Sequence, residues 1–302
     1  MLLTRKNLWI GLLLGVFGAL FFSVKAIIVK LAYRHGADPT TLIALRMVVA
    51  MPFFAVAAWY TSRPIAGRES PWRKGDAWRI FVLGLLGYYA ASYLDFLGLQ
   101  YISAGLERVI LYLSPTIVLL LSVVYLRKKI APIEYFALAV SYSGVVFVFW
   151  HDLSVINANT ALGAACVFGA AACYAVYITA GGEMVKRLGS IRMTAWASLV
   201  SCAACIVQGL IVDPGALMNQ QMPVYGLSLI NGIFCTVLPV FMTMMAIERI
   251  GSTTASQTSM LGPFATIFFA AWFLQEPITV SQIVGTVAAL VGVLMLGMKR
   301  AG

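Results

Sequence analysis

The chain has 302 residues, of which 61% are hydrophobic and 11% are charged, and its mean hydropathy is +0.91. A soluble domain carries about 25% charged residues, so this composition excludes an ordinary soluble globular protein. The formal net charge of +10 also gives no case for a nucleic-acid partner, because the basic residues do not gather in a segment with interleaved aromatic residues.

Apolar runs of membrane length follow one another along the chain and predict an all-α membrane protein. A spanning helix needs roughly 20 mostly apolar residues, and membrane strands would alternate in polarity, which these runs do not. The first run follows Arg5-Lys6 but is too long for a signal peptide, so we expect it to be retained as a helix. The ten predicted spans are 8–33, 41–61, 78–99, 103–126, 131–150, 160–183, 191–212, 224–247, 252–274 and 279–298.

The basic residues between these spans predict the orientation in the membrane. Cytoplasmic loops carry an excess of Lys and Arg. With both termini in the cytoplasm, most of the 21 Lys and Arg residues fall on the cytoplasmic side, while the opposite loops contain only Arg34. The cytoplasmic set is Arg5, Lys6, Arg63, Arg68, Arg73, Lys74, Arg79, Arg127, Lys128, Lys129, Lys186, Arg187, Arg192, Arg249, Lys299 and Arg300.

The second half of the sequence echoes the first. Residues 16–19 (VFGA) recur at 167–170, and residues 98–150 align with 246–298 without a gap, at an offset of 148 that matches Pro115 with Pro263. Two copies of five spans each must have opposite orientations in the bilayer, as in many secondary transporters. The expected fold is therefore two inverted five-helix repeats, residues 1–150 and 151–302, around a central cavity.

Ionisable side chains inside the spans belong to the first half. Such groups cost about 2.5–3.5 kcal/mol in mid-membrane, so they should face a cavity or a partner. Given the predicted topology, they converge in the outer part of the membrane. We expect Lys25 and Arg46 to face a vestibule, with Asp95 or Glu107 as counter-ions; the alternative is that these are structural ion pairs or side chains that reach the headgroups. The equivalent of Asp95 in the second half is the uncharged Thr243.

Polar and aromatic residues complete the predicted substrate path. Tyr89 and Tyr93 have i, i+4 spacing, which places them on one helical face. Polar stretches precede Pro115 and Pro263, and proline breaks the helical hydrogen-bond pattern. Paired polar, proline-interrupted segments indicate a binding site at the repeat interface, although helix packing through hydroxyl groups remains the alternative. The predicted path residues are Lys25, Tyr89, Tyr93, Tyr112, Ser114 and Gln257.

The five cysteines all lie in the predicted spans of the second half. Cys202 and Cys205 have redox or metal spacing, but no histidine is near them in the sequence, and we expect them to pack helices closely. We expect no metal site and no cofactor.

The segment 245–252 (MAIERIGS), followed by Gly262-Pro263 and 275–278 (QEPI), resembles the ending of EamA-type exporters of the drug/metabolite transporter superfamily. The segment 99–105 resembles the same ending in the first half. After the fourth predicted span, however, Lys128 stands in place of the acidic residue that is usual there. The resemblance implies a ten-helix bundle with a central cavity that exports amino acids or other small metabolites. The family includes exporters of aromatic amino acids.

The sequence therefore predicts a secondary transporter of the bacterial inner membrane, working by alternating access. Its partners would be a small-molecule substrate and the lipid bilayer. No nucleotide-binding motif of the G-x-x-x-x-G-K-[ST] type is present, so no nucleotide-driven subunit is implied. The alternatives are an intramembrane lipid- or metabolite-modifying enzyme and a membrane scaffold that transports nothing. The sequence leaves open whether the chain acts as a monomer or a homodimer.

Overall fold

The fold comes from a computed structural model, in which every element of the described residues is helical, in agreement with the all-α prediction. Helices suit this apolar chain because a helix satisfies its own backbone N–H and C=O groups where water is absent. The described residues are 5–63, 72–111, 113–126, 143, 158–258, 262–275, 278–280, 283–284, 287–288 and 291.

The helices of the first half follow the apolar runs closely. Helix α2 begins at Pro39, and the Asp38 side chain accepts a hydrogen bond of 3.0 Å from the backbone N–H of Thr41, as a helix cap does. The elements are α1 (Arg5–Arg34), α2 (Pro39–Ser62), α3 (Asp76–Gly84), the π-helical turn η1 (Leu85–Ala90), α4 (Ala91–Leu99), α5 (Ala104–Leu111) and α6 (Ser114–Leu126).

One helix of the second half, α11, is broken. The break lies at Gly251, whose φ of 80° and ψ of 160° are outside the helical region and suit a residue without a side chain. The elements are α8 (Ala158–Leu188), α9 (Ser190–Val212), α10 (Met222–Gly232), the π-helical turn η2 (Ile233–Val237), α11 (Leu238–Thr258), α12 (Gly262–Phe269) and the π-helical turn η4 (Ala270–Leu274).

Seven helices of the described part are long and apolar enough to cross a membrane, compared with ten predicted spans. The predicted span 131–150 has only Ser143 among the described residues, and most of 279–298 is likewise outside them. The predicted span 252–274 corresponds to the end of α11 after Gly251, followed by α12 and η4. Ten crossings therefore remain a prediction. The seven helices are Asn7–Arg34, Pro39–Ser62, Asp76–Leu99, Ala104–Tyr125, Ala158–Leu188, Ser190–Val212 and Met222–Ser256.

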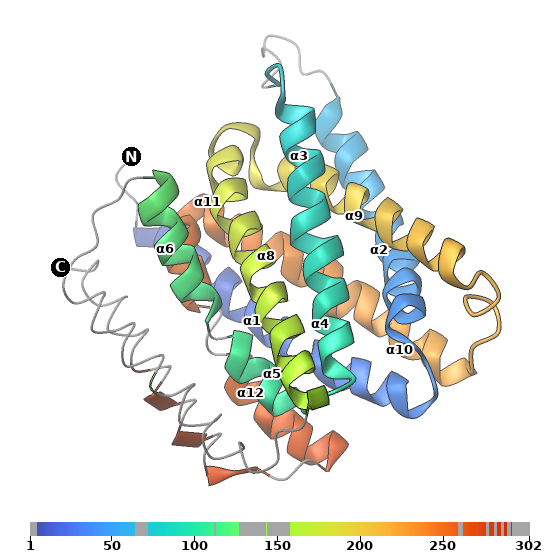
Figure 1. Ribbon diagram of the computed structural model, residues 1–302. Helices are drawn as coiled ribbons and strands as arrows, with labels where there is room; N and C mark the ends of the chain where they lie inside the picture. The colour runs from blue at the N-terminus through green and yellow to red at the C-terminus, as the bar shows by residue number, and fades with distance from the viewer. Residues whose placement is uncertain are drawn as a thin grey trace.

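The most extensive helix contacts join the two halves of the chain. Helix α1 packs on α11, α2 on α9 and α4 on α8, and the last pair runs side by side in Figure 1. The α4 and α8 backbones meet at Gly98 and Gly163, where a Cβ atom on Gly98 would lie 2.8 Å from the Gly163 carbonyl oxygen. Small residues allow such close approach in membrane helices. The buried core thus lies between the halves.

The two π-helical turns η1 and η2 occupy equivalent positions in the two halves. Turn η1 begins at Leu85 and η2 at Ile233, which is the same offset of 148 that aligns the halves in sequence. A π-helical turn inside an α-helix often marks a functional site. Both turns deliver residues to the cavity described next.

Candidate functional site

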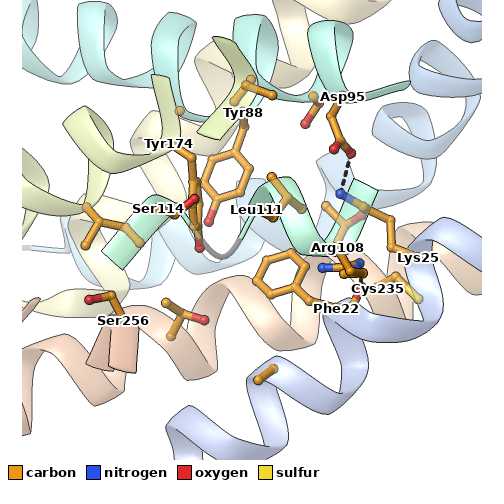
Figure 2. Close-up of a pocket in the computed structure, with 18 of the residues that line it drawn as sticks. Phe22, Lys25, Tyr88, Asp95, Arg108, Leu111, Ser114, Tyr174, Cys235 and Ser256 are labelled. Atoms are coloured by element: carbon orange, nitrogen blue, oxygen red, sulfur yellow. Dashed lines mark hydrogen bonds and ion pairs between the residues drawn. The ribbon is translucent and has the colours of Figure 1, made fainter. Parts of the chain in front are cut away.

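A cavity of about 150 Å³ lies between the two halves (Figure 2). An apolar cavity of about this volume holds a benzene-sized molecule, whereas pockets for drug-sized ligands run from about 300 to 1,000 Å³. The cavity therefore suits a small metabolite. Its lining comprises Ala19, Phe22, Lys25, Arg46, Gly87, Tyr88, Ala91, Ser92, Asp95, Arg108, Leu111, Ser114, Pro115, Ala170, Tyr174, Ile178, Cys235, Thr236, Thr243 and Ser256.

Pairs of residues at the offset of 148 line this one cavity from opposite halves. Tyr88 is matched by Thr236 and Asp95 by Thr243. Gly87 with Cys235 and Arg108 with Ser256 complete four such pairs. In three of these pairs the charged or aromatic member (Tyr88, Asp95 or Arg108) comes from the first half, so positions related by this offset carry different chemistry on the two sides.

Lys25 is the centre of a buried ion-pair network. Its ammonium group contacts the Asp95 carboxylate and lies 3.6 Å from Glu107 Oε1. Arg108 Nε lies 3.0 Å from Glu107 Oε2, and Arg108 Nη2 donates a hydrogen bond of 2.6 Å to the Phe22 carbonyl oxygen. Glu107 is fully buried. Removing one member of such a network leaves an uncompensated charge, which costs about 3–5 kcal/mol.

Arg46 also lines the cavity but has a different environment. Its guanidinium carbon lies 4.7 Å from the centre of the Phe96 ring, within cation–π distance. The residue is only 3% exposed, and its Nε and Nη2 atoms have no hydrogen-bond partner among the described residues. A buried donor without a partner is costly, at about 1–3 kcal/mol or more for a charged group.

Aromatic side chains line another part of the cavity. The Tyr88 ring centre lies 6.2 Å from that of Tyr174 and 5.0 Å from that of Tyr177, both with edge-to-face geometry. Phe22 approaches Tyr174 at 6.4 Å. Figure 2 shows the rings of Tyr88 and Tyr174 beside each other, with Lys25 pointing toward Asp95. The cavity thus has a charged side and an aromatic side.

The structure places two predicted path residues away from this cavity. Tyr89 borders a separate recess beside α9, lined by Ala204, Val207, Gln208, Ile211 and Val212, and Tyr93 packs on the apolar core. The reason is helical geometry. Tyr88, Ala91, Ser92 and Asp95 have i, i+3, i+4, i+7 spacing and share one face, whereas Tyr89 and Tyr93 lie on a neighbouring face.

Of the other predicted path residues and helix breaks, the structure describes the side chains of only some. Ser114 and Pro115 line the cavity at the start of α6, just after α5 ends at Leu111. Tyr112 lies outside the described residues. Gln257 belongs to α11 and Pro263 is the second residue of α12, as Pro115 is of α6, but their side chains are outside the described part.

Several lining residues were not singled out from the sequence: Cys235, Thr236 and Ile178, with Thr243 noted only as the equivalent of Asp95. The internal repeat in the sequence could have predicted three of these four lining residues. Applying the offset of 148 to Gly87, Tyr88 and Asp95 leads directly to Cys235, Thr236 and Thr243.

Polar contacts gather at the end of the bundle where α2 ends and α3 begins. Arg187 of α8 donates a hydrogen bond of 2.6 Å to Asp76 of α3, so it joins the two halves. Arg192 of α9 donates to the Thr61 carbonyl oxygen of α2. Ser190 donates to the Glu248 carboxylate within the second half. These contacts hold the helix ends together away from the cavity.

The cysteines of α9 serve packing. Cys202 is buried and lies 3.7 Å from the Met47 sulfur of α2, and Cys205 is buried one turn further along. All five cysteines are free thiols. Among the described residues, no group of three or more His, Cys, Asp or Glu side chains is arranged to hold a metal ion.

Known proteins with similar sequences are transporters. The EamA-like transporter family matches residues 9–150 and 161–298. An uncharacterized transporter of Bacillus subtilis, YcbK, is 30% identical over 281 residues, which cover 91% of this chain and 88% of that protein. The threonine/homoserine exporter RhtA of Salmonella typhimurium is 25% identical over 201 residues, covering 66% of this chain and 64% of RhtA.

The fold also has a solved counterpart. A crystal structure of another protein covers 98% of this chain and 98% of its own chain with a TM-score of 0.72, at 13% sequence identity. That likeness concerns the fold alone. The family match spans most of the chain, and seven membrane-length apolar helices are present in its described part. The chain therefore belongs to the EamA-like transporter family and is a multi-pass membrane transporter.

Proposed function

We propose that the protein exports small metabolites, foremost amino acids, across the bacterial inner membrane as a secondary transporter, without chemical change to the substrate. The observation that carries this proposal is the cavity between the halves, lined by residues at equivalent positions of both. A site at the interface of two repeats is what alternating access requires, because rocking of one repeat against the other opens the site to each side in turn.

We further propose that residues 1–150 and 151–302 are the two inverted repeats. Their support is the common offset of 148, which relates the aligned sequences, the turns η1 and η2, and four pairs of lining residues. The charge count between spans supports an orientation with both termini in the cytoplasm. In that orientation the polar contacts of Asp76, Arg187 and Arg192 lie on the cytoplasmic side.

Amino acids are the proposed substrates for two reasons. The cavity volume of about 150 Å³ fits a small molecule, and one relative is named as an exporter of threonine and homoserine. The tyrosine wall favours an aromatic or hydrophobic amino acid within this class. A substrate gradient or an ion gradient would supply the driving force.

Purified protein in liposomes tests the proposal. The liposomes are loaded with a panel of radiolabelled amino acids, and the release of each is measured and its identity checked by mass spectrometry. Protein-dependent release of unchanged amino acids is the expected result. Turnover of a lipid or metabolite without net flux would instead favour the alternative of an intramembrane enzyme and overturn the proposal.

A further inference from the structure

The charged side of the cavity holds more positive than negative groups. Among the described residues that line the cavity or pair with its lining side chains, the cations are Lys25, Arg46 and Arg108, and the anions are Asp95 and Glu107. With all five ionised, this cluster has one positive charge in excess. A buried charge without a counter-ion is strongly unfavourable, so the site has a place for one more anion.

Arg46 is the cation that lacks a counter-ion in this cluster. Lys25 is paired with Asp95 and Glu107, and Arg108 is paired with Glu107 and also donates to the Phe22 carbonyl oxygen. Arg46 instead lies over the Phe96 ring, with its guanidinium carbon 4.7 Å from the ring centre. None of the ion pairs within 4.0 Å among the described residues includes Arg46.

The two unpartnered atoms of Arg46 have the geometry of a carboxylate receptor. Nε and Nη2 form one edge of the guanidinium group, and both are buried without a hydrogen-bond partner in the part of the chain that the structure describes. Two parallel N–H bonds on such an edge match the two oxygen atoms of a carboxylate and form a bidentate, charge-assisted pair. A phosphate group fits the charge balance less well, since it carries about −1.5 to −2 at neutral pH.

We infer that the transported molecule pairs a carboxylate group with the Arg46 guanidinium group, which lines the cavity, and places its apolar part against Tyr88 and Tyr174. This inference rests on the proposed function and narrows its substrate class to carboxylates of benzene-like size. The carboxylate of the substrate supplies the partner that Arg46 lacks, and the aromatic side of the cavity receives the remainder.

Benzoate and benzamide are a matched pair of probes for this inference, because they share one shape and differ in the negative charge. Binding to the purified protein is measured by calorimetry and by the shift in melting temperature. We expect benzoate to bind and to stabilise the protein, and benzamide to do neither. Arg46→Gln should weaken benzoate binding about 10- to 100-fold, the range of a hydrogen bond to a charged group. Arg46→Lys, which keeps the charge but not the edge, should fall between.

Arg63→Gln is the matched control, because Arg63 is an exposed arginine stacked on Trp59 at 3.7 Å. It should bind benzoate as the wild type does. Unchanged benzoate binding by Arg46→Gln would overturn the inference. Equal effects of benzoate and benzamide on the wild type, including no effect of either, would overturn it as well. If Arg46→Gln does not fold, two measurements still test the inference. They are the comparison of benzoate with benzamide on the wild type and the binding of benzoate to Arg46→Lys.

Amino-acid flux separates this inference from the proposed function. Flux through Arg46→Gln at the wild-type apparent KM leaves the proposed function standing and overturns the role of Arg46. Arg46-dependent benzoate binding without flux of any amino acid supports the carboxylate site and overturns the proposed function.

Discussion

The Lys25 ammonium group contacts the Asp95 carboxylate, so a side chain of helix α1 is paired with one of helix α4 that lies 70 residues later in the chain. The pair forms one wall of the cavity between the halves (Figure 2). A movement that separates α1 from α4 at this level would stretch or break it. The pair is therefore placed to couple the cavity to the arrangement of the helices.

Lys25→Met should abolish flux and destabilise the fold by about 3–5 kcal/mol, because Asp95 and Glu107 then lose their shared cation. Lys25→Met with Asp95→Asn should recover most of the stability but none of the flux. Melting temperature and liposome flux are the two measurements. Lys186→Met, at an exposed ion pair with Glu183, is the control and should change stability by at most about 1 kcal/mol. Wild-type flux in the double variant would show that the pair is only structural.

Tyr88 and Tyr89 offer a matched test of which face of the third span lines the path. Tyr88→Leu removes an aromatic contact of the cavity wall and should raise the apparent KM for flux about two- to tenfold. Tyr89→Leu alters the recess beside α9 and should leave the KM within about twofold of the wild type. Concentration-dependent flux measures both. A larger effect at Tyr89 than at Tyr88 would contradict the assignment of the cavity.

Asp76 and Arg187 should show energetic coupling. Their hydrogen bond of 2.6 Å joins α3 to α8, and Asp76 is 3% exposed at the side chain. A double-mutant cycle of Asp76→Asn and Arg187→Gln, followed by chemical or thermal unfolding in detergent, should give a coupling free energy of about 1–3 kcal/mol. Additive effects of the two substitutions would mean that this contact does not hold the halves together.

The orientation in the membrane predicts opposite results from two reporter fusions. A reporter that is active only in the periplasm should be active after Asp213, where α9 ends, and silent after Arg73, just before α3. Hydropathy predicts two spans before Arg73 and seven before Asp213, so the two positions should lie on opposite sides of the membrane. The reverse pattern of activity would invert every assignment of inside and outside.

Much of the fold could be predicted from the sequence because continuous apolar runs have few alternatives in a membrane. The predicted span 41–61 corresponds to helix α2 (Pro39–Ser62), and the predicted span 191–212 corresponds to helix α9 (Ser190–Val212). The proximity of Lys25 to Asp95 and Glu107 followed from the cost of isolated charges in hydrocarbon.

Other features depend on how neighbouring helices pack. Choosing Tyr88 over Tyr89 requires knowledge of which face of the third span meets α8. The break at Gly251 within α11, and the contact of Arg187 with Asp76, likewise arise from tertiary contacts. Hydrophobicity along one helix holds no information about them.

Blocking the cavity tests most directly the central claim that substrate crosses the membrane through it. Thr243→Trp places an indole group in the cavity, whereas Val207→Trp adds the same group on α9 at a position that is 52% exposed. Amino-acid flux is measured in liposomes that contain equal amounts of folded, monodisperse protein. We predict that Thr243→Trp loses flux while Val207→Trp retains it. Wild-type flux through Thr243→Trp would show that the substrate takes another path.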